Sequence, residues 1–540
     1  MLAILSAAMF VYVIDTTIMN VAISALVEDL GTTVGGVQLA ITLYTLTMAA
    51  FMLTGGKLGD IWGSKRAFRI GLVVYGVGTT ITALAPTIGF IIIGWSILEG
   101  LGSALIVPAI NTLVRANYEG AKRASAYGVL FGVAAAGAAF GPLIGGWLTT
   151  ALTWRVAFAA EAVIVLIVLL SSGLLVDAPP VKPTPKLDGV GVVLSATGLG
   201  LFVFGVLQIA SRGWTDPLVL VLIVGGLAVL GVFWWWIKRR EAANLDVLLH
   251  PSIFRHPSIN AGLPILSTQT FAQAGLLFLV PVFTQSVLGF TAFETGVTVL
   301  PLSLGILATS ILTPPLGRKV YPKYIIQGGL VILFLGGFAL ALALPDATTG
   351  GDLALGLLLA GLGIGIVAGQ LPNLILSGVE QREASEASGL QGTAQNLGMA
   401  LGTAIVGSVI LSVALTSMGN LVEQSALPPG IKSEVESIVE EPFERADADA
   451  FKEGVSGLPQ HQQDGLGDIY LAGTLRGFQG AILVGGTVAL LGALLAFRLP
   501  KKKLPSDSDT ETTIKEIVRS PTIPTIQFEM EELPTRESAS

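Results

Sequence analysis

The chain of 540 residues contains no cysteine, only three histidines and few charged residues. The absence of cysteine excludes disulfides and thiolate metal sites. Charged residues make up 12% of the chain, whereas about 25% is typical of a soluble domain. The sequence also lacks the G-x-x-x-x-G-K-[ST] loop of ATP-driven proteins. It shows neither metal-ligand spacing nor a nucleophile beside a base, so we expect a protein that is not an enzyme and needs no cofactor.

Apolar residues dominate instead, at 52% of the chain with a mean hydropathy of +0.76. A bilayer core of ~30 Å requires about 20 helical residues to cross it. About fourteen apolar stretches meet this length, and the sequence therefore predicts an all-α membrane protein with 14 transmembrane helices. They lie near 4–27, 36–58, 67–86, 88–112, 125–150, 156–176, 190–210, 216–237, 259–285, 293–314, 324–344, 352–378, 387–415 and 476–497.

Basic residues fall mainly on alternate loops between these spans. Of the 30 Lys and Arg residues, 21 lie on loops of one side and 6 on the other. Because cytoplasmic loops carry the excess of Lys and Arg, both termini are predicted to be cytoplasmic. Met1 opens almost directly into the first span without a basic leader, so we expect this helix to be retained rather than cleaved.

Two segments are expected to lie outside the bilayer. The loop 416–475 carries 11 acidic and 3 basic residues, and its stretch IKSEVESIVEEPFERADADAF fits a short amphipathic helix on the outer face. The tail from 504 onward, with 8 acidic and 3 basic residues, fits a disordered segment. We interpret both as solvated spacers, with partner binding as the alternative.

Three carboxyl groups stand inside the predicted spans, away from their ends: Asp15, Glu99 and Glu161. A charge in mid-membrane costs ~2.5 to 3.5 kcal/mol even on a lenient scale, so such residues usually face a cavity and serve a function. All three histidines lie in loops, and a proton crossing the membrane must therefore use a carboxyl group. Removal from water favours the uncharged carboxylic acid, as a reversible proton carrier requires.

Polar neighbours suggest that two of these acids line a cavity. Asp15 is followed by Thr16, Thr17 and Asn20, while Ser96 and Ser103 share one helical face with Glu99. Glu161 lies six residues after Arg155, so an ion pair is as good an interpretation as a role in cation binding. In the second half, Gln273 and Asn373 are candidates for substrate contact, although membrane amides more often join helices.

The loop after the second span, GGKLGDIWGSKRAF, gathers glycines, one acid and two bases at the cytoplasmic surface. Its residues are Gly56, Asp60, Gly63, Lys65 and Arg66. We interpret this turn as an inner gate whose ion pairs form when the gate closes. The simpler alternative is that Lys65 and Arg66 only set the topology.

The fifth span contains GVLFGVAAAGAAFGPLIGG, in which Gly137, Gly141 and Gly145 recur every four residues. Glycines on one face allow a neighbouring helix to approach closely. Pro142 removes a backbone hydrogen bond and bends the helix.

Together these segments resemble the major facilitator superfamily, specifically its fourteen-span drug:proton antiporter branch. The resemblance implies two six-helix bundles, 1–177 and 259–500, the second including the acidic loop 416–475. Segment 178–258 would be a linker with two additional helices, and 501–540 a cytoplasmic tail. It also implies that the Gly-x-x-x-Gly-Pro-x-x-Gly-Gly motif, residues Gly137, Gly141, Pro142, Gly145 and Gly146, forms a pliable interface between the halves.

The chain departs from the family's motifs at several positions. Ile61 replaces a usual basic residue of the inner-gate motif, and Ile23-Ser24 replaces the usual Leu-Pro in the first span. In the fourth span Ser96 stands where Arg is usual, and Glu99 where Gln is usual. We therefore hypothesise that proton coupling depends on Glu99 without an arginine partner, together with Asp15 and Glu161.

The resemblance implies a proton-coupled efflux transporter of the plasma membrane that exports hydrophobic, in some cases cationic, drugs by alternating access. Its partners would be protons, small-molecule substrates and the lipid bilayer, without nucleic acid, and the protein would be a monomer. One alternative is an exporter of a specific endogenous lipid, siderophore or metabolite. Another is a transporter-like membrane sensor or assembly protein.

Overall fold

The computed structural model describes residues 1–118, 120–177, 186–379, 383–425 and 459–501, and every regular element in these ranges is a helix. The all-α prediction is confirmed. Within the same ranges, 13 helical stretches are long and apolar enough to cross a membrane. The predicted third span corresponds to α4, Ser64–Ala83, whose first turns carry Lys65, Arg66 and Arg69 and which is not among the 13. The number of fourteen spans therefore stays a prediction.

The N-terminal half begins with two helices separated at Ala22, where one continuous span was predicted. The helices of this half are α1 Leu2–Val21, α2 Ile23–Leu30, α3 Val34–Trp62, α4, α5 Ile88–Ile91, the π-helix η1 Ile92–Glu99, α6 Gly100–Asn117, α7 Gly120–Ala151, α8 Trp154–Ser171 and the short η2 Ser172–Leu174. The side chain of Thr33 caps α3 by accepting from the Gly36 N–H, which satisfies one of the free donors at the helix start.

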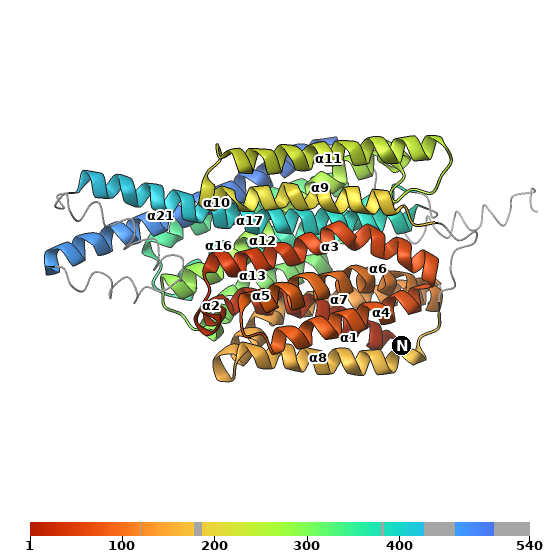
Figure 1. Ribbon diagram of the computed structural model, residues 1–540, viewed down its shortest axis with the longest axis horizontal. Coiled ribbons are helices and arrows are strands. Elements are labelled where there is room, and N and C mark those ends of the chain that lie inside the picture. Colours follow the sequence, from red (N-terminus) through yellow and green to blue (C-terminus); the bar gives the residue numbers. More distant parts are fainter. Residues whose placement is uncertain (119, 178–185, 380–382, 426–458, 502–540) are drawn as a thin grey trace, which may run out of the picture.

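Two long helices follow the N-terminal half and precede the C-terminal half. They are α9 Gly189–Leu207 and α11 Pro217–Ala242, joined through the short α10 Ile209–Arg212, and the 3-10 turn η3 Pro251–Arg255 leads onward. Figure 1 shows α9 and α11 side by side along one flank of the molecule. Leu199 and Val203 of α9 pack against Leu46 of α3 and Ala400 of α17, so this helix contacts both halves.

The C-terminal half consists of long helices joined by short helical turns. Its helices are α12 Pro257–Ser286, α13 Ala292–Leu312, α14 Leu316–Lys319, α15 Pro322–Ala343, η4 Leu344–Asp346, η5 Gly350–Leu353, α16 Ala354–Leu376, α17 Ala384–Gln424, α21 Gln460–Leu495 and η6 Ala496–Arg498. A capping box between Thr291 and Glu294 starts α13.

The last two long helices continue well past their predicted ends. Apolar stretches at 387–415 and 476–497 were predicted, but α17 runs to Gln424 and α21 starts at Gln460. In Figure 1 both extend beyond the other helices at one end of the bundle. Hydropathy detects only the apolar part of a helix. Before their ends α17 and α21 contact each other, since a Cβ at Gly473 would lie 2.2 Å from the Met418 side chain. The predicted amphipathic helix within the loop lies outside the described residues.

The two halves meet along two pairs of helices, α7 with α13 and α3 with α17. Where α3 meets α17, the Gln38 side chain of α3 donates to the backbone oxygens of Thr403 and Ala404, both at 3.0 Å. Near the end of α1, the Gln285 side chain donates to Val21 O and accepts from the Ser24 N–H, again at 3.0 Å. Between α7 and α13 the Phe293 N–H donates to the Thr150 hydroxyl and Ser303 to Ala138 O.

Candidate functional site

Asp15 lies in the middle of α1 with its side chain fully buried. The indole Nε1 of Trp95 donates to its Oδ1 at 2.7 Å. The Trp95 ring stacks on Tyr44 of α3, with 4.5 Å between the ring centroids and 5° between the planes. This stacking orients the indole donor towards the carboxylate.

Glu99 is the last residue of the π-helix η1 and is also fully buried. The hydroxyl of Thr82 on α4 donates to its Oε1 at 3.1 Å. Among the described residues, the other oxygen, Oε2, has no hydrogen-bond partner, and the same is true of Oδ2 of Asp15. Each of these two carboxyl groups therefore has one partnered and one free oxygen.

Glu161 reaches the same place from α8. The Tyr75 hydroxyl donates to its Oε1 at 2.5 Å, and the Thr79 hydroxyl to Oε2 at 3.5 Å. The ion pair with Arg155 that the sequence left open is not formed, because the Arg155 guanidinium pairs with Asp29 and donates to Ala85 O. Glu161 instead lies beside the other two acids.

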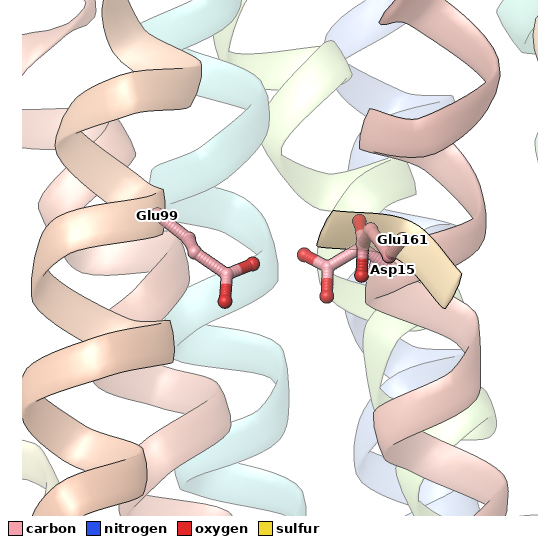
Figure 2. Close-up of side chains that lie close together, drawn as sticks. All are labelled: Asp15, Glu99 and Glu161. Atoms are coloured by element: carbon pink, nitrogen blue, oxygen red, sulfur yellow. The ribbon is translucent and has the colours of Figure 1, made fainter. Parts of the chain in front are cut away.

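The three acids, hereafter the acid cluster, place one carboxylate oxygen each within 4.8 Å of one another. Figure 2 shows Glu99 directed across a gap towards Asp15 and Glu161, which come from different helices. Within the described residues no basic side chain forms an ion pair with them. Three adjacent carboxylates cannot all be charged without compensation, so the cluster can hold protons or a hard cation.

The remaining candidates for the substrate cavity bond mostly within their own helices. Thr16 donates to Val13 O, Asn20 to Thr16 O and Asn373 to Gly369 O, while Gln273 accepts from Gln269. Two serines bridge to α3 instead: Ser96 donates to Ala40 O, and Ser103 lies 3.3 Å from the Tyr44 hydroxyl. The predicted polar face around Glu99 thus packs against α3.

The inner-gate residues surround the sharp turn between α3 and α4. Gly63 has φ +90° there, a conformation that favours glycine. The Lys65 ammonium donates to Gly173 O and Leu175 O, and its backbone N–H donates to Asp177. Lys65 therefore ties the turn to the segment that follows α8 in the same half. No ion pair of Asp60 or Arg66 exists among the described residues, and the latch stays a prediction.

The glycine motif of α7 faces two different helices. A Cβ at Gly141 would fall 2.0 Å from the Thr17 hydroxyl, and one at Gly145 would lie 2.8 Å from Ile18, so this face packs on α1. A Cβ on Gly146 would lie 2.3 Å from Ala292 O of α13, in the other half. Gly137 packs near Val13, and Pro142 O lies against Gly296. Part of the motif therefore touches the other half, and part packs on α1.

Sequence reasoning missed the donors of the acid cluster. Tyr75, Thr79 and Thr82 recur at intervals of four and three residues on α4, the spacing of one helical face. Trp95 precedes Glu99 by four residues. This polar stripe on α4 could have indicated a buried polar partner. Each residue type is common in membrane helices, however, so no single position identified the acid that it bonds.

Comparison with known proteins adds independent findings. The family model described as Major Facilitator Superfamily matches residues 5–189 and 188–403. A probable actinorhodin transporter of Streptomyces coelicolor is 30% identical over 419 residues, which cover 76% of this chain and 72% of that protein. A puromycin resistance protein of Streptomyces alboniger is 31% identical over 412 residues, covering 76% and 81%.

Solved structures share the fold at low sequence identity. A bacterial homologue of the human lysosomal transporter Spinster, in an inward-facing and unoccupied conformation, has a TM-score of 0.62 and 16% identity. The match covers 93% of this chain and 98% of the other.

Proposed function

This chain belongs to the major facilitator superfamily, a multi-pass family of the plasma membrane, and from this premise we propose that it is a proton-coupled efflux transporter of antibiotics and similar hydrophobic compounds. The names of its relatives support export: one is a probable actinorhodin transporter, and another confers resistance to puromycin. The acid cluster is the observation that supports proton coupling.

The coupling mechanism follows from the chemistry of the acid cluster. A buried carboxylate is costly, so Asp15, Glu99 and Glu161 take up protons when they open to the outside and release them when they open to the cytoplasm. The donors around them carry no charge, so the cluster is compensated by bound protons or a hard cation, and we propose protons. Export of one cargo molecule is then tied to the inward movement of protons.

Alternating access requires the two halves to rock against each other. The glycine contacts between α7 and α13 suit such movement, because the two backbones approach closely there. The side-chain hydrogen bonds between these helices, such as Phe293 N–H to Thr150 and Ser303 to Ala138 O, would break and re-form. The spans 1–177 and 259–500 would move as the two bundles, with the protein acting as a monomer.

The test uses purified protein in sealed proteoliposomes with an imposed pH gradient and a panel of dyes and antibiotics. We expect wild type to move substrates only with the gradient, and Asp15→Asn and Glu99→Gln to lose most of this movement while still folding. Glu28→Gln, an exposed acid outside the cluster, is the matched control and should retain full transport.

Four results would contradict the proposal. Gradient-driven transport by Asp15→Asn and Glu99→Gln at the wild-type rate would exclude the acid cluster from coupling. Movement driven by a Na⁺ gradient alone would replace the proton by another ion. The absence of movement for every substrate would favour a sensor or assembly protein, and movement of a single compound would favour a dedicated metabolite exporter.

A further inference from the structure

The end of α11 carries an ordered ladder of aromatic and basic side chains. Trp234, Trp235 and Trp236 are each followed four residues later by a cation, Lys238, Arg239 and Arg240. The cations lie over the rings at 5.0, 5.5 and 5.7 Å from the ring centroids. Residues four apart are neighbours on a helix surface, so this spacing makes three parallel cation–π contacts.

One rung of this ladder is anchored inside the protein. Trp236 Nε1 donates to both oxygens of the buried Asp188, at 3.1 and 3.2 Å. Arg240 donates to Asp246 O at 3.0 Å and lies 3.9 Å from the Asp188 carboxylate. These contacts fix the rotation of α11, so the other two aromatic–cation pairs lie on other faces of the helix than Asp188.

The other two aromatic–cation pairs, Trp234 with Lys238 and Trp235 with Arg239, are exposed on the surface of α11. The exposed fraction is 55% for Trp235 and 37% for Trp234, and Lys238 and Arg239 are exposed as well. Neither cation forms an ion pair with a carboxylate of the described residues. The neighbouring Glu241 is occupied as the acceptor of the Ser252 hydroxyl.

We propose that this aromatic and basic face, formed by Trp234, Trp235, Lys238 and Arg239, binds the phosphate headgroup of an anionic phospholipid in the cytoplasmic leaflet. Aromatic rings sit at the level of lipid headgroups, and cytoplasmic loops carry the positive charge. Basic clusters beside a transmembrane helix attract anionic lipids. Charge complementarity thus selects the lipid.

The rest of α11 supplies a surface for the acyl chains. Exposed apolar side chains continue along the helix away from the ladder: Leu218, Leu220, Val221, Val224, Leu227 and Val232. A phospholipid can therefore place its chains along this helix while its phosphate meets Lys238 and Arg239. A free anion would use only the charged end, and this difference separates the two ligands experimentally.

The test measures the melting temperature of the full-length protein in neutral detergent while a short-chain phosphatidylglycerol is titrated. We expect a saturable rise for wild type, and an apparent dissociation constant raised about tenfold in Lys238→Gln/Arg239→Gln, since each surface cation contributes to the attraction. Arg69→Gln/Lys501→Gln removes the same charge from other exposed cytoplasmic positions and should bind as wild type does.

Two further arms identify the ligand. Phosphatidylcholine of the same chain length, and inorganic phosphate, should each give little stabilisation. Trp235→Leu, which keeps both cations, should weaken phosphatidylglycerol binding. Equal binding by Lys238→Gln/Arg239→Gln and wild type, equal effects of the two lipids, or equal effects of inorganic phosphate would each overturn the proposal. Because no gradient is used, this result is independent of proton coupling.

Discussion

Each carboxyl group of the acid cluster accepts a hydrogen bond from an uncharged donor: Trp95 for Asp15, Thr82 for Glu99 and Tyr75 for Glu161. Hydrogen bonds to charged groups are worth about 1.5–3 kcal/mol, more than those between neutral groups. These donors make a buried negative charge tolerable without supplying a permanent positive one. The cluster can therefore gain and lose protons, whereas a fixed arginine partner would hold one acid ionised.

Tyr75→Phe tests whether an uncharged donor to Glu161 supports proton coupling. Removing the hydroxyl deletes the 2.5 Å bond to Glu161, and the loss of about 1.5–3 kcal/mol corresponds to about tenfold or more in gradient-driven transport. Tyr127→Phe is the control, because its hydroxyl donates to the backbone oxygen of Asn111 at 3.0 Å and not to an acid of the cluster. Transport by Tyr75→Phe at the Tyr127→Phe rate would remove Glu161 from the coupling mechanism.

The π-helix η1 is the element that shapes the site. The Gly100 N–H bonds to Trp95 O, five residues earlier, which widens the turn that carries both Trp95 and Glu99. Short π-helical segments are rare and often occur at functional sites. The element also packs closely on α4, because a Cβ at Gly78 would lie 2.5 Å from Gly94 O. Neither feature is visible as a periodicity in the sequence.

Deletion of Ile93 tests the role of this wider turn. Ile93 is 52% exposed, and removing one residue lets the segment close as an α-helix while the flanking helices keep their faces. Trp95 would then rotate away from Asp15, and we expect loss of most gradient-driven transport with the protein still inserted. Ile93→Ala keeps the chain length and should transport normally. Full transport by the deletion variant would show that the π-turn is dispensable.

At the scale of the whole molecule, the segment between α11 and α12 ties the additional helices to the C-terminal half. His250 contacts Glu386 through its backbone N–H and through Nδ1, 3.0 Å from Oε2, and His256 Nε2 lies 3.0 Å from Glu383. The hydrogen bond to Glu386 raises the pKa of His250 above its usual 6.5, an effect that Glu241 supports and that Lys57 and partial burial oppose.

The contact between His250 and Glu386 predicts that the protein loses stability as the pH rises. A raised pKa means that the contact contributes fully below about pH 6.5 and is lost as pH rises through the higher folded-state value. We expect the melting temperature of wild type to fall, relative to His250→Gln, between about pH 6 and 8. Glu386→Gln should remove the same pH-dependent part of the melting temperature. The double variant His250→Gln/Glu386→Gln should show no larger loss than either single variant. Parallel pH profiles for wild type and His250→Gln would exclude the pair as its source.

The sequence by itself determined the helical class, the positions of most spans and the three acids of the site. Lipid cannot satisfy backbone polar groups, so apolar runs of this length must be helices, and a carboxyl group inside them is too costly to be incidental. Asp15, Glu99 and Glu161 were therefore identifiable one at a time.

Only the tertiary structure decided that these acids meet, and which groups surround them. They lie on α1, η1 and α8, and their distance depends on how three helices pack, which no local pattern encodes. The same holds for Tyr75, Thr82 and Trp95, whose donors matter only because another helix presents an acceptor. The polar ends of α17 and α21 also escaped hydropathy, because a polar segment of a helix does not stand out as part of an apolar span.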